Sequence, residues 1–560
     1  MAEAKNCKQC QTKFAIKDEN LEFYKKISPI FDGKIFNLPS PTLCYECRLQ
    51  RRFAQRNENN LYYRTCDLCG KQTLTNYDPD KKLKIFCSKC WHSDRWDGKD
   101  YARNYENGKS FFKQFHELEQ LVPLYANKIV HSDNCEFCNQ IVNCSDCYLL
   151  FTSKGSKNCY YSQFCHDSFK CFDCFNVEKC ENCYECINVN NSYGCFLLKD
   201  SENCRDCWFG YGLVGCEDCI GSNNLKHKKY YVFNKEYSKE EYQRLKLQLL
   251  NDFKITKEKF FNDITNFPHR FAQIKNCENC SGDVLRNSRN LQNCFFANSG
   301  ENCTNYIHVH STKDSMDSMG GVNNNLCYES QSLGTGNYNV LFCSNINACR
   351  DSYYLTNCTD CESCFGCVGL KNKKYYILNK EFSGKNYEKE VARIISEMTR
   401  QQEWGEFLPM KIAPFSYNES FANIHFPLTE KQIREKGLAW LDKEENIKTP
   451  EEFYDVKEVS YYNKVKEAER LLNGTMKCQV SGRAFKIQPA ELAFYLEYRI
   501  PISEIHPQER LNDRLKENFS YKLFHRVCMN ESCTNEFETT YAPERPEKVY
   551  CEGCYQKSVI

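Results

Sequence analysis

The sequence predicts a mainly β fold with α segments, in which zinc ribbons flank two β-solenoids that have twelve-residue coils and helical caps. Three observations lead to this prediction. Of the 560 residues, 40 are cysteines; cysteines recur every twelve positions in the middle of the chain; and closely spaced cysteine pairs lie near both ends. Because repeats with a short fixed period bury their inner faces only against their neighbours, we expect rods rather than one globular core.

The composition favours a cytoplasmic thiol and metal protein over a secreted disulfide scaffold. The first ten residues, MAEAKNCKQC, contain no apolar stretch and already carry a CxxC pair, which argues against a signal peptide. No run approaches the roughly 18–20 apolar residues that span a bilayer, and the mean hydropathy is -0.69. We therefore expect no membrane association.

Residues 1–98 are expected to form a double zinc-ribbon module, followed by a helical linker over 99–130. Two CxxC knuckles can supply four thiolates in the tetrahedron that structural zinc requires. Unliganded thiols and an iron–sulfur cluster are the alternatives. The four pairs are Cys7/Cys10, Cys44/Cys47, Cys66/Cys69 and Cys87/Cys90.

Residues 476–560 repeat this module. The segment FAIKDENLEFY matches FKIQPAELAFY 471 positions later, and three arginines recur 462 positions later. Those arginine pairs are Arg48/Arg510, Arg52/Arg514 and Arg64/Arg526. The second ribbon of the copy is intact as Cys528/Cys533 and Cys551/Cys554.

The first ribbon of the C-terminal copy has decayed to Cys478, Ser481, His506 and Glu509. If the four cysteine pairs were cross-braced, the decay of the first two pairs would remove ligands from both metal sites of the copy. If they pair sequentially, one site is lost completely and the other stays intact. Sequential pairing therefore predicts three structural zinc ions, two at the N-terminus and one at the C-terminus. A residual site at Cys478, His506 and Glu509 remains an alternative to a pocket filled by side chains.

The first solenoid is expected over 131–232. Residues 135–230 divide into eight rows of twelve, and all sixteen cysteines there occupy row positions 1, 4, 7 or 10. These positions must face inward, where a narrow coil admits only small side chains. The rows open with Cys135, Cys147, Cys159, Cys171, Cys183, Cys195, Cys207 and Cys219. Packing of free thiols is the favoured role; metal storage and, in an oxidising compartment, disulfides are the alternatives.

The same pattern returns more weakly in the second solenoid, 276–377. Its rows are expected to begin at Gly282, Cys294, Tyr306, Ser318 and Ser330, and then, after one row two residues short, at Val340, Ser352 and Cys364. Cap helices and linkers are expected over 233–275 and 378–475. Ser238 and Glu241 form a capping box that predicts the first cap helix.

Two resemblances follow from these motifs. The period and the inward-facing triplet rhythm resemble the coil of the insect antifreeze β-helix in architecture only, because the paired surface threonines of ice binding are absent. The pattern CxxxGxxF with ELxFY, a following ribbon and FETTYAPERPE resembles a group of cysteine-rich zinc-ribbon repeat proteins. That resemblance spans most of the chain and implies no established activity.

Three function classes compete. The first is an RNA or DNA binder, because arginine forks grip phosphate and aromatic rings stack on unpaired bases. The candidate contacts are Arg48, Arg51, Arg52, Arg56, Tyr62 and Tyr63. Residues 1–100 hold 19 Lys+Arg against 13 Asp+Glu, a weak basic surplus. The alternative is a structural role for these arginines, which their retention in the less basic C-terminal copy favours.

The second class is a protein-interaction scaffold. Its candidate contact stripe is the aromatic ladder at row position 2, which comprises Tyr148, Tyr160, Phe172, Tyr184, Phe196 and Trp208. The third class is an enzyme. We find no HExxH, GxSxG, nucleotide-binding glycine loop or deaminase pattern, and four-thiolate ribbons leave zinc no open position. The sequence therefore predicts a non-enzymatic zinc adaptor with a nucleic-acid or protein partner and no small-molecule substrate.

Overall fold

The computed structural model describes residues 3–442, 452–518 and 520–559, with more strand than helix. The chain splits into two compact units. The first unit comprises Met1–Asn127, Ala272–Leu441 and Tyr521–Leu523; the second comprises Lys128–Phe271, Asp442–Ser520 and Phe524–Ile560. The seven consecutive segments expected from the sequence are thus combined into discontinuous units: the N-terminal module belongs with the second repeat array, and the C-terminal module with the first. None of the described helices is long and apolar enough to cross a membrane.

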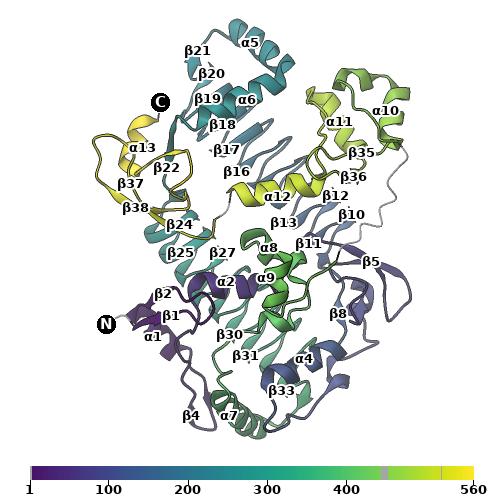
Figure 1. Cartoon of the computed structure of the whole chain (residues 1–560), viewed down its shortest axis with the longest axis vertical. Helices are drawn as coiled ribbons and strands as arrows, with labels where there is room; N and C mark the ends of the chain where they lie inside the picture. Colours follow the sequence, from purple (N-terminus) through teal and green to yellow (C-terminus); the bar gives the residue numbers. More distant parts are fainter. Residues whose placement is uncertain (1–2, 443–451, 519, 560) are drawn as a thin grey trace. The chain divides into compact units, whose positions relative to one another are not determined.

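The first array forms an 11-stranded sheet in the second unit (Figure 1). Its strands run in spatial order β9 (Ile129–Val130), β11 (Asn139–Val142), β13 (Phe151–Lys154), β14 (Gln163–His166), β15 (Phe175–Glu178), β16 (Ile187–Asn190), β17 (Phe196–Glu202), β18 (Trp208–Tyr211), β19 (Glu217–Asn223), β20 (Lys229–Val232) and β21 (Lys235–Glu236). A second ladder starts with β10 (Asp133–Glu136) and β12 (Ser145–Tyr148). From β9 to β20, neighbouring strands are parallel and pair twelve positions apart, as Phe175 does with Ile187, so one row of the sequence is one layer of the stack. The last strand, β21, pairs with β20 antiparallel.

The second array forms a 12-stranded sheet in the first unit. Its strands are β23 (Ile274–Lys275), β24 (Glu278–Arg286), β25 (Arg289–Asn298), β26 (Glu301–Thr304), β27 (Ile307–His310), β28 (Lys313–Met316), β29 (Asn325–Tyr328), β30 (Tyr338–Leu341), β31 (Arg350–Tyr353), β32 (Glu362–Phe365), β33 (Lys374–Ile377) and β34 (Lys380–Glu381). All pairings are parallel except that of β33 with β34, which closes the array.

Every third residue of a row turns the backbone through the left-handed region. In one row these residues are Asp173 (φ 55°), Asn176 (φ 51°), Lys179 (φ 53°) and Asn182 (φ 54°). A left-handed residue that is not glycine costs roughly 1–2 kcal/mol, but asparagine and aspartate tolerate it and here stack across rows. Asn176 donates to Asn188 and Asn188 donates to Asp200, both at 2.8 Å.

The inward-facing cysteines are free thiols and almost all are buried. A typical one, Cys171, directs its sulfur at the carbonyl oxygens of Phe169 and Cys180, at 3.5 and 3.6 Å. The thiol thus fills the narrow interior and contacts backbone acceptors of its own and the next layer. This geometry favours the packing role for most of the ladder.

One prediction about the second array is wrong. Val340 pairs with Cys327, and the amide of Cys343 donates to Ser330 at 3.1 Å. The row that ends before Val340 therefore has one residue more than the period, and not two fewer. The rows before it begin three positions earlier than predicted. Because inward positions recur every three residues, adding one residue and removing two have the same effect on the inward pattern, and the sequence pattern alone does not distinguish them.

Gly282 is required where β24 shifts register against β25. Its φ is +134°, and a Cβ there would lie 1.7 Å from the carbonyl oxygen of Cys294. Gly282→Ala is therefore expected to disrupt the first rows and to lower the free energy of unfolding by about 3 kcal/mol or more. Gly336→Ala is the matched control: φ is +72° but nothing lies within 4 Å, so only about 1 kcal/mol of strain is expected. Denaturant titration compares the two; equal losses would contradict the assignment.

Helices follow each array. The predicted cap helix is confirmed as α5 (Lys239–Asn251), with Ser238 as N-cap and Glu241 completing the capping box; α6 (Phe253–Ile264) follows it. After the second array come α7 (Gly384–Arg400), α8 (Phe421–His425) and α9 (Glu430–Glu435). The linker expected over 99–130 contains α4 (Phe111–Leu121). Of the linker expected over 378–475, residues 443–451 lie outside the described residues.

Candidate metal centres and the surfaces that hold the modules

The N-terminal module is built from short hairpins and helices. Its elements are β1 (Glu3–Asn6), β2 (Lys13–Ile16), α1 (Asp18–Lys26), β3 (Ile30–Phe31), β4 (Lys34–Ile35), α2 (Tyr45–Phe53), β5 (Tyr62–Thr65), β6 (Gln72–Thr75), β7 (Ile85–Phe86) and α3 (Ser88–Trp91), and β7 pairs with β8 (Leu124–Tyr125) of the following linker. The C-terminal module follows α10 (Val465–Asn473) and contains β35 (Met476–Lys477), β36 (Ala484–Phe485), α11 (Pro489–Tyr498), α12 (Pro507–Asn518), β37 (Phe524–Val527), β38 (Glu536–Thr539), β39 (Lys548–Tyr550) and α13 (Glu552–Ser558). β39 pairs with β22 (Pro268–Arg270) of the same unit.

Three groups of four cysteines come together in these modules, each with all sulfur atoms within 4.8 Å of one another. The groups are Cys7/Cys10/Cys44/Cys47, Cys66/Cys69/Cys87/Cys90 and Cys528/Cys533/Cys551/Cys554. These are the groups that sequential pairing predicts. One sulfur–sulfur distance in each group is 3.7, 3.9 and 3.8 Å respectively. A tetrahedron with metal–sulfur bonds of about 2.3 Å has edges of about 3.8 Å, so each group could hold a metal ion.

Local structure sets this geometry in the same way in both copies. In each group, one sulfur pair lies at a hairpin turn and the other at a helix start, where Cys87 is the N-cap of α3 and Cys551 the N-cap of α13. Both N-caps have φ -62° and ψ 163°. The amide of Cys87 donates to the sulfur of Cys66, and that of Cys551 to the sulfur of Cys528, each at 3.3 Å. Amide donors of this kind stabilise thiolates, the form that binds metal.

One thiol of the first group, that of Cys44, loses its proton readily. A hydrogen bond from Cys47 is the largest influence on Cys44 and lowers its pKa to about 5, although burial acts in the opposite direction. Because a metal ion binds the deprotonated sulfur, a thiolate at neutral pH makes capture of an ion more favourable.

The decayed ribbon is organised differently. The backbone amide of His506 donates to the sulfur of Cys478 at 3.2 Å, and its ring Nδ1 accepts from the amide of Gln508 at 3.1 Å. Burial lowers the pKa of His506 to about 4, and Glu509 lies 3.8 Å from Arg483. Within the described parts of the chain, Cys478, His506 and Glu509 are not among the groups that could hold an ion. This geometry favours the side-chain-filled pocket.

The arginines proposed as nucleic-acid contacts lie inside the first unit. Arg48 pairs with Asp317 at 3.0 Å, and Arg51 and Arg52 pair with Glu329 at 2.6 and 3.0 Å. Their side chains are at most 9% exposed, and both carboxylates are 0% exposed. These groups therefore fix α2 against the second array, which agrees with the structural alternative.

The three other proposed contacts are divided. Arg56 is buried and forms an ion pair with Glu58. Tyr62 donates to Glu419 at 2.8 Å, whereas Tyr63 is 57% exposed. Of the six candidates, only Tyr63 presents most of its side chain to solvent.

The second unit repeats the same attachment. Arg510 pairs with Asp173 at 2.5 Å, and Arg514 pairs with the same carboxylate at 2.9 Å. Asp173 lies 144 positions before Asp317, and both occupy row position 3 once the irregular row is corrected. The equivalent arginines of the two modules thus contact equivalent carboxylates of the two arrays.

Aromatic residues complete each attachment. In the second unit, Phe494 and Tyr495 of α11 contact Phe172 and Tyr184, with ring centroids 4.3 and 5.9 Å apart. In the first unit their counterparts Phe23 and Tyr24 contact Tyr328, at 6.1 and 5.4 Å. Tyr184 and Tyr328 are again 144 positions apart.

The aromatic ladder is therefore largely a covered surface. Phe172, Tyr184, Phe196 and Trp208 are each at most 5% exposed, while Tyr148 and Tyr160 are half-buried. The expectation that this ladder forms an open contact stripe is wrong for the four buried members. The C-terminal module packs on Phe172, Tyr184 and Phe196, and Lys246 of α5 lies over Trp208.

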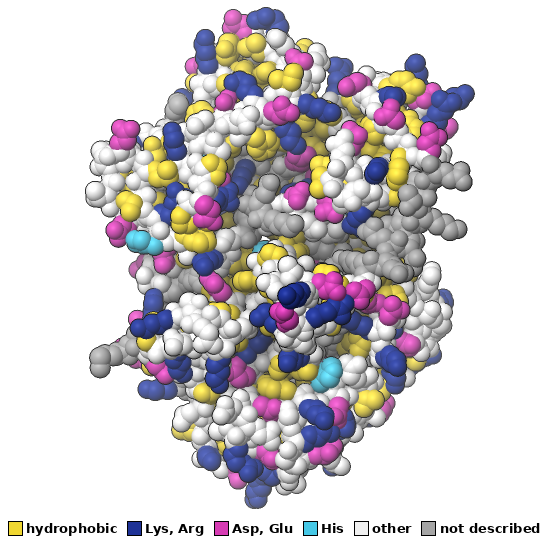
Figure 2. Space-filling view, in the orientation of Figure 1, with side chains coloured by type: hydrophobic (Ala, Val, Ile, Leu, Met, Phe, Trp, Pro, Cys, Tyr) yellow, Lys and Arg dark blue, Asp and Glu magenta, His cyan; other side chains and the backbone are white. Residues whose placement is uncertain are grey.

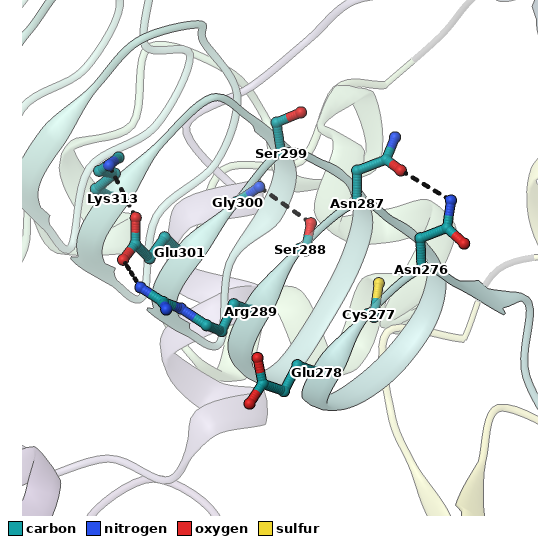
Figure 3. Close-up of a pocket in the computed structure, with 10 residues that line it drawn as sticks. All are labelled: Asn276, Cys277, Glu278, Asn287, Ser288, Arg289, Ser299, Gly300, Glu301 and Lys313. Carbon is teal, nitrogen blue, oxygen red and sulfur yellow. Dashed lines mark hydrogen bonds and ion pairs between the residues drawn. The ribbon is translucent and has the colours of Figure 1, made fainter.

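A surface pocket lies over the first rows of the second array (Figure 3). Its two cationic groups are paired, since Arg289 and Lys313 both form ion pairs with Glu301. The amide of Asn276 donates to Asn287 at 3.2 Å as part of the corner ladder. The polar atoms at this pocket thus stabilise the stack.

The sequence missed the carboxylates Asp173, Asp317 and Glu329. Asp173 and Asp317 are separated by the same 144 positions as Tyr184 and Tyr328. This shared spacing between the two arrays was a signal that could have identified the carboxylates. No protein-family model matches the chain, and no curated protein matches it either.

Proposed function

We propose that the chain is a non-enzymatic zinc protein that works as an intracellular scaffold, in which zinc ribbons stabilise two modules clamped on β-solenoids. The observation that carries the proposal is the tetrahedral spacing of three four-cysteine groups. Four thiolates fill the coordination sphere of zinc and leave no position for a substrate or an activated water. Zinc in this role supplies folding energy to small modules.

A protein partner is favoured over a nucleic acid. The guanidinium groups best placed to grip phosphate are paired within the first unit. On the face seen in Figure 2, basic and acidic side chains are interspersed instead of forming a basic stripe. The hairpin of β3 and β4 instead exposes a cross-strand apolar pair, Ile30 at 64% and Ile35 at 57%. Apolar groups of this kind suit contact with another protein.

Native mass spectrometry of the purified chain tests the proposal. We expect three zinc ions per wild-type chain and two in Cys66→Ser, since three thiolates hold zinc less tightly than four. Cys478→Ser is the matched control and should keep all three, because Cys478 lies outside the four-cysteine groups. A wild-type chain without zinc would overturn the proposal. Iron bound in place of zinc would show that the four-cysteine groups are iron sites.

The same spectra address the partner. Co-purifying protein, retained at moderate salt, is the expected finding. Co-purifying RNA or DNA that dissociates steeply as salt rises would instead indicate a nucleic-acid adaptor, because phosphate contacts release counterions.

A further inference from the structure

A fourth group of cysteines lies outside both modules, in the interior of the first array. The sulfur atoms of Cys159, Cys165 and Cys171 lie within 4.8 Å of one another. All three residues are 0% exposed. They therefore form a compact trio of soft donors closed off from water.

The coil geometry explains how the trio arises. Cys159 and Cys171 both occupy row position 1 and open consecutive rows, so their side chains stack one layer apart. Cys165 occupies position 7, on the opposite side of the coil, and its sulfur reaches across the narrow interior. In the adjacent rows position 7 holds Ser153 and Val177, and no other row of this array has a cysteine there. Packing alone therefore does not require a sulfur at this position.

The hydrogen bonds of Cys165 also differ from those of its neighbours. Cys159 and Cys171 each donate to the carbonyl oxygen two residues earlier, at 3.4 and 3.5 Å. Cys165 instead directs its thiol at the sulfur of Cys159, 3.7 Å away. The hydroxyl of Ser156 lies 3.8 Å from the sulfur of Cys165 but donates to the backbone oxygen of Cys165 at 2.9 Å. A sulfur that faces other sulfurs in place of a backbone acceptor is arranged as a ligand is.

We propose that Cys159, Cys165 and Cys171 bind one copper(I) ion inside the first array. Soft thiolates select copper(I) or zinc, but zinc needs a fourth ligand. The group offers three sulfurs, and its complete burial admits no water. Copper(I) is satisfied by two or three sulfurs, so the trio suits it without a further ligand.

Charge balance limits the protonation of the site. Copper(I) bound by three thiolates would leave a net charge of -2 in an apolar interior, which is costly. Loss of two protons, with the third sulfur kept as a neutral thiol donor, leaves -1. Binding therefore releases two protons, involves no change in the oxidation state of copper, and requires the ion to enter while the rows are still assembling.

The test uses the full-length chain, unfolded and refolded without oxygen in the presence of zinc and copper(I), and then washed with a copper(I) chelator. Cys165→Val is the informative variant, because Val177 and Val189 occupy position 7 in the following rows. Cys174→Ser is the matched control: it removes a buried ladder cysteine outside the trio, at a position that is serine in Ser162 of the preceding row. Copper and zinc are counted by elemental analysis, and circular dichroism checks that each variant folds.

We expect the wild type and Cys174→Ser to retain one more copper per chain than Cys165→Val, with equal zinc in all three. Copper held in the zinc modules is common to the three proteins and cancels in this comparison. X-ray absorption of the extra copper should show only sulfur neighbours. Equal copper in the wild type and Cys165→Val, including none in either, would overturn the proposal.

Discussion

Removal of zinc is expected to unfold the intact ribbons of the modules while the arrays keep their parallel ladders. Structural zinc contributes about 10–16 kcal/mol of apparent binding energy in small zinc-finger peptides, as much as the whole stability of about 5–15 kcal/mol of a typical domain. The arrays hold their rows by backbone hydrogen bonds between layers, such as Phe172 to Cys183 at 2.9 Å. Their stability therefore does not depend on an ion in the modules.

Hydrogen exchange with mass spectrometry, before and after a chelator, measures this effect. Peptides that cover Cys66–Cys90 and Cys528–Cys554 should lose protection, whereas β15 to β18 should retain it. The hairpin of β35 and β36 is an internal control, since it belongs to the decayed ribbon and should respond less. Unchanged protection of all peptides after the zinc has left would show that the ribbons fold without metal.

The local signals in the sequence were sufficient to predict the groups of four cysteines and the period of the arrays. Cysteine spacing gave the groups of four because a tetrahedral site needs two knuckles close together in space, and the loss of one whole ribbon in the copy identified the partners. The twelve-residue period was visible because the interior positions hold cysteine, serine, glycine or an aliphatic residue in nearly every row. The Ser238 capping box marked the helix that follows the first array.

Long-range packing was not predictable in the same way. The position of Arg48, Arg51 and Arg52 directly after a knuckle suggests a basic surface, and nothing local reveals that Asp317 and Glu329, more than 260 residues later, face them. The repeat period likewise gives no indication that the N-terminal module belongs with the second array and the C-terminal module with the first. The length of the irregular row was predicted wrongly because the inward pattern repeats every three residues. Such a pattern does not distinguish one added residue from two missing ones.

Glu329→Gln is expected to lower the free energy of unfolding of the first unit by about 3–5 kcal/mol, the usual cost of removing one partner from a buried ion pair. Glu329 is 0% exposed and accepts from both Arg51 and Arg52. The amide keeps the shape of the side chain but removes the charge that balances these guanidinium groups. The loss should appear as faster exchange of α2 and as a lower denaturant midpoint for the first unit.

Glu185→Gln provides the matched control, because Glu185 occupies the equivalent position 144 residues earlier. Its partner there is Lys257 at 2.7 Å, with side chains 26% and 36% exposed for the glutamate and the lysine. A pair so exposed to solvent contributes about 1 kcal/mol or less. A large difference between the two substitutions would show that buried charge pairing, and not the row position, holds the N-terminal module. Similar small losses would mean instead that the aromatic contacts of Phe23 and Tyr24 with Tyr328 are sufficient to keep the module on the array.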